Sequence, residues 1–501
     1  MRDRLFRGKL LAADVCMVFL GYGGLNRAQF GSDTLFRMLM PESDIGGAID
    51  HGRYGTYLLA TALLRCGVQI TDHYRFFYLM FMLSIVACLY MLQRIFLPIF
   101  EERLRSGAAQ VYYACATGVG LVNVLFIENF MFPEYQIKYA CAYTLAIGGA
   151  WCLTRRRWGW GGILSVLGCI FYQTALIPVA MLVGAFFVMD ADFMLSKGLF
   201  FKTFLTDMAL MLIGFLDNMS GYVLVMFHVI SPQQFGKRIS PVSARLISWI
   251  LGESRDLLKS SLGLMPGIWA PGLMLMFFWG LVLIYLLDPR RRMKRGATLL
   301  LFLTDIVFVL LLPFLSGEGG FFPRVVWVFY LFLLTGMFVA WKLRSGEQRE
   351  ASPGEASRLL VMDAAAVGFL LLQLLSCQNI SINRYISNTL DLTYARAVLS
   401  RIEAYGAQTG IPVTKLATEI DTVCLRGYDE VHYRRDQINE RTMSVVPYSL
   451  LEYVNGPGIQ MEKVSMDETV WEEHFQGRNW DRFDPEEQLY FKGDTLYWVI
   501  F

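Results

Sequence analysis

Long apolar stretches recur along the first three-quarters of the chain, at lengths that fit helices crossing a bilayer. A transmembrane helix needs about 17 to 25 mostly apolar residues. The stretches of this kind are 9–25, 75–98, 110–127, 136–153, 203–227, 271–287, 298–316, 323–342 and 359–378. This pattern predicts an all-α polytopic membrane protein.

A further apolar stretch, 158–189, is too long for one helix. It carries Tyr172, Gln173 and Pro178 near its middle, which favours two helices that meet at a turn. Dividing the stretch brings all the basic clusters to one side of the membrane, as expected for cytoplasmic loops. These clusters are Arg103 with Arg105, Arg155–Arg157, Lys197 with Lys202, Arg290–Arg295, and Lys342 with Arg344 and Arg349. The sequence thus predicts about 11 transmembrane helices with a cytoplasmic amino end.

Two segments have the amphipathic pattern of helices that lie in the membrane interface. The segment 54–70 is apolar on one face and is interrupted by Arg65 and Gly67, and apolar residues recur at helical spacing over 246–262. We expect both on the outer side. The outer loops are then 33–72, 128–136, the turn at Gln173, 228–271 and 316–324.

The composition changes after Cys377. Residues 1–378 form the predicted transmembrane domain, and 379–501 are rich in charged residues and tyrosine, with no further span. We expect a helix at 391–405 and strands at 413–420 and 493–501. The last part of the chain is therefore predicted to be a small extracytoplasmic α/β domain.

The overall composition supports a membrane protein and excludes several other classes. Hydrophobic residues make up 55% of the chain and charged residues 18%, and 45 basic residues nearly balance 43 acidic ones. With this balance of charges, the sequence shows no sign of nucleic-acid binding. The nine cysteines lie mostly in apolar stretches and form no disulfide framework. No metal-ligand spacing is evident, although a divalent metal is not excluded.

The first outer loop, 26–72, is the first candidate for chemistry. An ionisable group beside hydrocarbon is costly unless it faces a cavity or an ionic partner, so charges there suggest a functional site. Transfer of a sugar from phosphate to a hydroxyl requires a base and a cation. Asp33 is the predicted general base, and Arg37 orients it or binds phosphate; a surface salt bridge between the two is the alternative. The loop also contains the binding candidates Asp44, Asp50 and Arg53.

Further candidates lie in the later outer loops. Arg324 suits a phosphate at headgroup depth, or it anchors a helix by snorkelling. Gln173, which follows Tyr172, contacts sugar or satisfies the broken backbone between two helices. Glu128 and Glu318 are candidates to assist at the same level.

Four elements occur in a recognisable order: the Asp-and-Arg loop, Gly52-Arg53-Tyr54-Gly55, Tyr172-Gln173, and Arg324. Over roughly residues 1 to 350 the chain resembles the bacterial serotype-converting O-antigen glucosyltransferases. The resemblance implies the C-type glycosyltransferase fold in the bacterial cytoplasmic (inner) membrane. It also implies a hexose donor, glucose, carried on polyprenyl phosphate, and transfer to a surface glycan on the outer face.

The family's first-loop acid maps to Asp33. Family members often carry two adjacent acids there, whereas here Ser32 precedes Asp33, so a shared role for Asp44 or Asp50 stays open. We expect an inverting displacement without an evident cofactor. No nucleotide-sugar domain is expected, because no Gly-rich phosphate loop opens an α/β unit in the sequence. The expected pathway partners are a donor-lipid synthase on the cytoplasmic face and a small flippase.

Two other functions remain open. A lipid-linked saccharide transporter would use the aspartates within or beside spans, which are Asp14, Asp207, Asp217, Asp305 and Asp363. The absence of an internal sequence repeat and the one-sided loop charges favour chemistry over alternating access. A noncatalytic scaffold whose outer domain binds a polymer is the third possibility.

Overall fold

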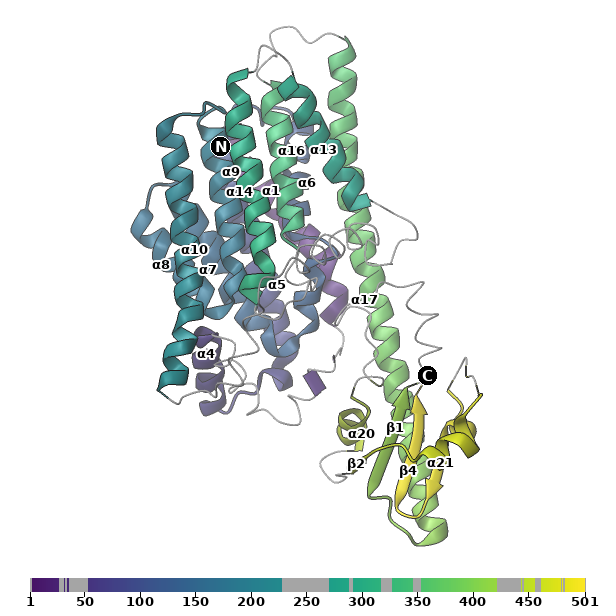
Figure 1. Cartoon of the computed structure of the whole chain (residues 1–501). Coiled ribbons are helices and arrows are strands. Elements are labelled where there is room, and N and C mark those ends of the chain that lie inside the picture. Colours follow the sequence, from purple (N-terminus) through teal and green to yellow (C-terminus); the bar gives the residue numbers. More distant parts are fainter. Residues whose placement is uncertain are drawn as a thin grey trace.

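The computed structural model describes a helical bundle and a small module that contains a sheet (Figure 1). The described residues are 2–26, 31, 34–35, 53–227, 270–287, 292–316, 327–345, 353–420, 443, 446–455, 461–478, 480 and 483–500. The predicted amphipathic segment 246–262 lies outside these residues.

Helices dominate the described part of the bundle. Four helical segments in it are long and apolar enough to cross a bilayer, namely Tyr74–Phe100, Gln173–Asp190, Lys197–Asp217 and Val361–Thr409. This content is consistent with a helical membrane protein. The bundle helices include α1 (Arg2–Tyr22), α5 (Tyr74–Phe100), α6 (Gly107–Leu121), α7 (Gln136–Thr154), α10 (Lys197–Met226), α13 (Ala270–Leu287), α14 (Arg292–Ser316) and α16 (Phe329–Ser345).

The long apolar stretch is divided as its polar residues predicted. Helix α8 (Trp158–Phe171) ends at Tyr172, whose backbone is extended, and η5 (Gln173–Ala175) leads into α9 (Leu176–Asp190). The rings of Trp158 and Phe187 are 6.0 Å apart, so the two helices run in opposite directions. The prediction of two helices that meet at a turn is confirmed.

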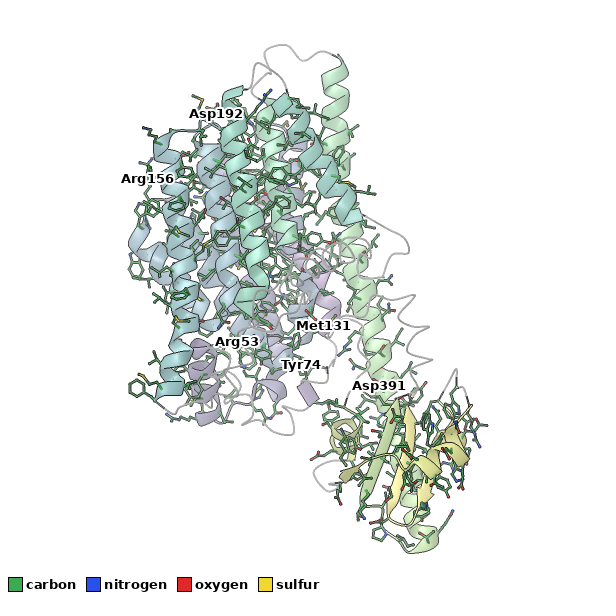
Figure 2. The ribbon with its side chains drawn as sticks, in the orientation of Figure 1. Arg53, Tyr74, Met131, Arg156, Asp192 and Asp391 are labelled. Carbon is green, nitrogen blue, oxygen red and sulfur yellow. The ribbon has the colours of Figure 1, made fainter. Side chains whose placement is uncertain are left out.

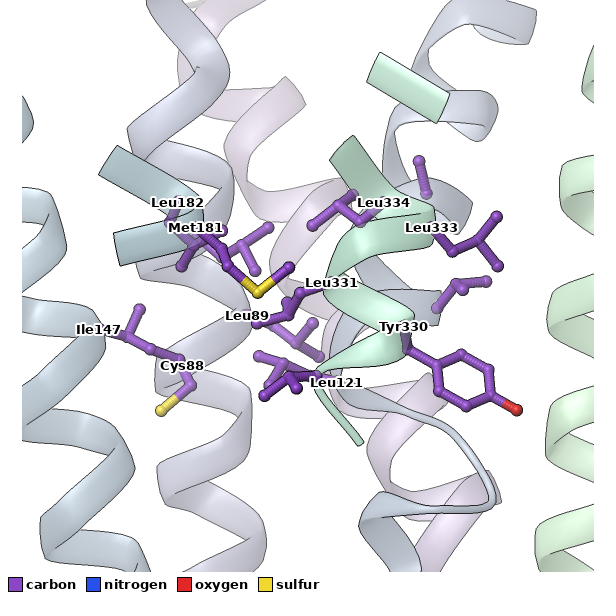
Figure 3. Packing of buried hydrophobic residues seen from close by; sticks show 14 of the residues in the cluster. Cys88, Leu89, Leu121, Ile147, Met181, Leu182, Tyr330, Leu331, Leu333 and Leu334 are labelled. Carbon is purple, nitrogen blue, oxygen red and sulfur yellow. The ribbon is translucent and has the colours of Figure 1, made fainter. Parts of the chain in front are cut away.

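Helix α9 lies in the centre of the bundle, while α10 lies at its edge. In their apolar windows 94% of the residues of Gln173–Asp190 are buried, against 33% for Lys197–Asp217. Side chains from α5, α7, α9 and α16 meet around Met181 and Leu331 (Figure 3). Hydropathy alone does not separate a helix surrounded by protein from one that faces lipid.

The predicted helix 110–127 is too long at its carboxyl end. Helix α6 ends at Leu121, and η3 (Phe126–Met131) and η4 (Pro133–Tyr135) follow, within a buried segment. Side chains supply backbone hydrogen bonds there: the N–H of Asn123 donates to the Tyr22 hydroxyl (2.9 Å), and the N–H of Phe126 donates to Asn123 Oδ1 (2.9 Å). Irregular backbone at membrane depth is tolerated where protein surrounds it.

One helix joins the bundle to the carboxyl-terminal module. Helix α17 (Pro353–Thr409) runs through the predicted boundary at 378/379 and through the predicted separate helix 391–405. Buried residues continue at helical spacing across this boundary, from Cys377 and Ile380 to Ala395 and Val398. The composition changes while the helix does not.

The module contains a four-stranded sheet in the order β2-β1-β4-β3. Strand β1 (Lys415–Ile420) is parallel to β2 (Glu462–Val464) and to β4 (Thr495–Ile500), and β3 (Leu489–Lys492) is antiparallel to β4. The predicted strands 413–420 and 493–501 correspond to β1 and β4, while β2 and β3 were not predicted. The α/β character of this part is confirmed.

Both faces of the sheet are covered, as the alternation along β4 shows. Leu496 and Trp498 belong to a core with Val398 of α17, which we call the module core. Tyr497 and Val499 belong to a second core on the other side of the sheet. Alternate residues of a strand point to opposite faces, so β4 is buried on both sides.

The bundle has two chemically different ends (Figure 2). Arg156 and Asp192 lie at one end, and Arg53, Tyr74 and Met131 lie at the other. At the first, Lys294 and Lys342 form ion pairs with Asp192 at 3.9 and 3.8 Å. We call these the basic end and the tyrosine end. Basic residues of several predicted cytoplasmic loops thus share one end, as the positive-inside rule requires.

Candidate functional site

Four tyrosines from two parts of the chain define the tyrosine end. Tyr135, Tyr139 and Tyr143 follow one another at intervals of four residues on η4 and α7, and Tyr172 comes from the turn after α8. Ring centroids are 5.7 Å apart for Tyr135 and Tyr139, 5.2 Å for Tyr139 and Tyr172, and 6.3 Å for Tyr143 and Tyr172. We call this group the tyrosine cluster.

Two cations lie over the rings of the tyrosine cluster. The guanidinium carbon of Arg53 is 5.2 Å from the Tyr172 ring centroid and 5.9 Å from that of Tyr135. The Lys138 ammonium is 4.4 Å from the Tyr135 ring, although this lysine is only 1% exposed. Such cation–π contacts strengthen when the cation is removed from water. The charge of Lys138 is therefore held beneath the surface at this end, while Arg53 is half-buried.

Two buried carboxylates come from the irregular segment that precedes α7. Glu128 on η3 is fully buried, and Glu134 on η4 is 2% exposed. The Thr34 hydroxyl donates to Glu134 Oε2 at 3.0 Å, across one hundred residues of sequence. The Tyr143 hydroxyl donates to Asn129 Oδ1 at 3.0 Å beside Glu128 in the chain. Buried charges of both signs are costly and need partners, so they mark a built polar site.

The described residues that follow Gly52 lie beside the carboxyl end of α8, with Arg53 over the Tyr172 ring and Gly55 against Phe171. Arg53 directly precedes α4 (Tyr54–Arg65), the counterpart of the predicted amphipathic segment 54–70. A Cβ added at Gly55 would lie 2.9 Å from the Phe171 ring, so only glycine allows this close approach. Thr56 donates to the Phe171 carbonyl at 3.1 Å, and the hydroxyls of Tyr54 and Ser220 are hydrogen-bonded.

Gln173 connects the α8–α9 turn to a neighbouring helix. Its side-chain amide donates to Asp217 Oδ2 on α10 at 3.0 Å, and both residues are buried. One alternative from the sequence was that Gln173 satisfies backbone groups between the two helices. The observed hydrogen bond instead joins its side chain to another side chain. It fixes the turn that carries Tyr172.

The predicted site residues that the structure describes all lie at the tyrosine end. Arg53 contacts Tyr172 although 119 residues separate them in sequence, Gln173 follows in the same turn, and Glu128 lies on η3 just before the tyrosine cluster. The other predicted residues lie outside the described residues: Asp33, Arg37, Asp44, Asp50, Glu318 and Arg324.

Several residues of this end were not among the sequence candidates. They are Glu134, Tyr135, Lys138, Tyr139 and Tyr143, whereas Asp217, the partner of Gln173, was named only for the transporter alternative. Two signals were present in the sequence. Lys138 interrupts an apolar span, where an ionisable residue suggests function, and the tyrosines recur every four residues on one helix face.

The arrangement suits an anionic ligand. Arginine and lysine supply charge and donors for phosphate. Carboxylates accept hydrogen bonds from sugar hydroxyls, and tyrosine hydroxyls either donate or accept them. Among the described residues no group of three or more His, Cys, Asp or Glu side chains is arranged to hold a metal ion. Comparison of the chain with protein-family models, curated proteins and solved structures gave no match.

Proposed function

We propose that this protein is an inverting membrane glycosyltransferase. It transfers a hexose, with glucose as the first candidate, from polyprenyl phosphate to a hydroxyl of a surface glycan such as O-antigen. The proposal includes a C-type glycosyltransferase fold of about 11 spans in the bacterial cytoplasmic membrane. The observation that carries it is the placement of Arg53 and Lys138 over the tyrosine cluster, at the end opposite the basic residues.

The donor lipid would approach this site from the bilayer. Helix α10 carries exposed apolar side chains, Phe215 and Leu216, directly before the buried Asp217. A polyprenyl chain can lie along such a surface while its phosphate reaches Arg53 and Lys138. In this proposal Arg37 and Arg324 are further phosphate ligands, and Glu128 and Glu134 bind sugar hydroxyls.

The chemical step is a single displacement at the anomeric carbon. Asp33 accepts the proton of the acceptor hydroxyl while the oxygen of that hydroxyl attacks the anomeric carbon. The bond from the anomeric carbon to the phosphate oxygen breaks, and polyprenyl phosphate leaves with the electron pair. Cations held in a water-poor site stabilise the charge that develops on this leaving group. Whether Asp44 or Asp50 shares the proton with Asp33 stays open in the proposal.

The side of the membrane follows from the charge distribution. If the basic end faces the cytoplasm, the tyrosine end faces the exterior, where the acceptor glycan is. The donor would then be made by a synthase on the cytoplasmic face and moved across by a small flippase. The carboxyl-terminal module would lie outside, next to the acceptor.

The test replaces Asp33 by Asn in the full chain. Surface glycans are analysed by mass spectrometry in cells that contain wild-type protein, Asp33→Asn or no protein, at matched abundance. The matched control is Asp72→Asn, the same change at an exposed carboxylate of η2 (Ile70–His73). We expect the added hexose with wild type and control and its loss with Asp33→Asn. Unchanged modification by Asp33→Asn rejects this base.

A lipid-linked saccharide transporter is the second candidate, and the buried carboxyls of the bundle favour it. Asp14 accepts a hydrogen bond from Gln93 at 2.7 Å, Asp305 accepts one from Thr335 at 3.0 Å, and both carboxyls are fully buried. Such groups can carry protons in transporters. Movement of labelled carrier lipid across vesicles that contain only this protein would favour this candidate over transfer.

A further inference from the structure

A short described turn of the first outer loop touches both parts of the molecule. The N–H of Leu35 donates to the Gly31 carbonyl at 3.1 Å. Thr34 and Leu35 are both fully buried. Figure 1 draws this turn as a short purple piece between the bundle and the module.

The two neighbouring side chains lie in different environments. The Thr34 hydroxyl donates to Glu134 at the tyrosine end of the bundle. Leu35 belongs to the module core, together with Val398, Leu450 and Trp498. Consecutive Cα atoms are about 3.8 Å apart, so the module core comes within one residue of the polar site at this point.

The part of α17 between the bundle and the module carries buried polar residues. Arg384, Asn388 and Asp391 are each at most 3% exposed, although they lie between the last α17 residue of the bundle core, Ile380, and Ala395 of the module core. Asp391 Oδ2 accepts a hydrogen bond from the backbone N–H of Met443 at 3.1 Å. The junction is therefore a packed interface along a continuous helix.

We propose that the module holds the first outer loop in place, with Leu35 as a positioning residue built into the module core. Thr34 fixes the same turn to Glu134. The functional consequence rests on the proposed transfer reaction, because Asp33 directly precedes Thr34 in the chain. A module that contributes to acceptor binding would also set the position of the base.

The first experiment measures hydrogen exchange, which is independent of activity. Full-length Leu35→Ala is compared with wild type and with Ile411→Ala, a truncation of an exposed residue of the module. We expect exchange in module peptides that contain Val398, Leu450 or Trp498 to rise by about tenfold or more in Leu35→Ala, because a core contact is lost. Ile411→Ala should leave it unchanged. Faster exchange confined to the peptide around residue 35 overturns the proposal.

The reverse substitution adds a reciprocal test. Val398→Ala removes a buried side chain of α17 from the module core, whereas Ser400→Ala changes an exposed position on the same helix. Coupling between two regions acts in both directions, so Val398→Ala should speed exchange around residue 35 and Ser400→Ala should not. An unchanged rate around residue 35 in Val398→Ala contradicts the proposed contact.

The last experiment concerns catalysis. In Thr34→Val we expect kcat to fall by about tenfold, since the turn that carries the base loses its hydrogen bond to Glu134. Thr34→Ser keeps the hydroxyl and should restore kcat. If wild type shows no transfer, the proposed function fails, while the exchange experiments still decide whether the module holds the loop. Equal loss in Thr34→Val and Thr34→Ser overturns the role of the hydroxyl.

Discussion

The two ends of the bundle differ in how deeply they hold charge. At the basic end, the side chain of Asp192 is 66% exposed, and those of its partners Lys294 and Lys342 are 26% and 12% exposed. At the tyrosine end, Lys138 is 1% exposed and Glu128 is fully buried. Exposed ion pairs contribute about 0–1 kcal/mol, whereas buried charges carry a desolvation penalty of several kcal/mol per ion. A fold retains such charges at a cost, so burial rather than charge alone distinguishes the candidate site.

The comparison predicts its largest effect for matched arginine truncations at the two ends. Arg53→Ala should lower the transfer rate by about 100- to 1000-fold, as expected for loss of one group that stabilises the leaving charge. Arg155→Ala removes an exposed arginine at the basic end, where it donates to the Arg94 carbonyl, and should change the rate less than twofold. Hexose transfer by purified protein in liposomes measures both. Equal losses in the two variants would remove the distinction between the ends.

The close approach at Gly55 allows a test of stability. Gly55→Ala places a methyl group 2.9 Å from the Phe171 ring and should destabilise the protein by about 1–3 kcal/mol. Gly162 lies on α8 with nothing within 4 Å of an added Cβ, so Gly162→Ala should stabilise by roughly 0.5–1 kcal/mol. Thermal unfolding in detergent measures both shifts. A melting temperature for Gly55→Ala at or above the wild-type value would refute the tight docking of α4.

The cation–π contact of Arg53 gives a smaller effect. Tyr172→Ala should weaken donor binding by about 0.5–2 kcal/mol, while Tyr172→Phe keeps the aromatic face and should lose less. Donor Kd in the two variants measures the difference. If Phe is as damaging as Ala, the Tyr172 hydroxyl rather than the ring face is what the site requires.

The basic end should tolerate loss of its shared carboxylate. Asp192→Asn removes charge from an exposed side chain that pairs with both Lys294 and the less exposed Lys342. We expect a change in unfolding free energy of at most about 1 kcal/mol, and less at high salt. A larger loss would show that these ion pairs stabilise the bundle as strongly as buried charges.

Exposed carboxylates of the module give a pH dependence that is small but has a definite sign. A backbone hydrogen bond from Thr469 and the charge of Lys492 lower the pKa of Asp467, and hydrogen bonds from Thr414 and Lys415 lower the pKa of Asp494. Their stabilisation is therefore complete above the ordinary carboxyl pKa and is lost as the pH falls below about 4.

Hydrogen exchange of module peptides at pH 7 and pH 3, after correction for intrinsic rates, measures this loss. Asp494→Asn removes one of the two carboxylates and should weaken the pH dependence. A module that becomes more protected on acidification would contradict the sign.

The sequence predicted the helices well where apolar residues and breaking residues agreed. Tyr172 and Gln173 marked the turn between α8 and α9, and basic residues marked one end of the bundle. It failed where tertiary contacts replace local rules. The end of α6 at Leu121 depends on the side chains of Tyr22 and Asn123, which accept hydrogen bonds from the non-helical backbone that follows.

Only part of the candidate site was predicted from the sequence, again because some of its residues acquire their role through tertiary contacts. Arg53 and Tyr172 were singled out by the family resemblance, and the structure brings them together. Glu134 was missed because its significance depends on burial, which a sequence does not display, and Lys138 was missed although it interrupts an apolar span. Leu35 was missed because an apolar residue in a charged loop gives no sign of the distant core that it joins.

Photolabelling with a polyprenyl-phosphate hexose that carries a photoreactive group near the phosphate tests the central claim most directly. Cross-linked peptides from the full-length protein in liposomes are mapped by mass spectrometry. We predict labels in the segments 128–139 and 171–175, with marked loss in Arg53→Ala. Labels concentrated at the basic end, around Asp192 and Lys294, would contradict the assignment of the donor site to the tyrosine end.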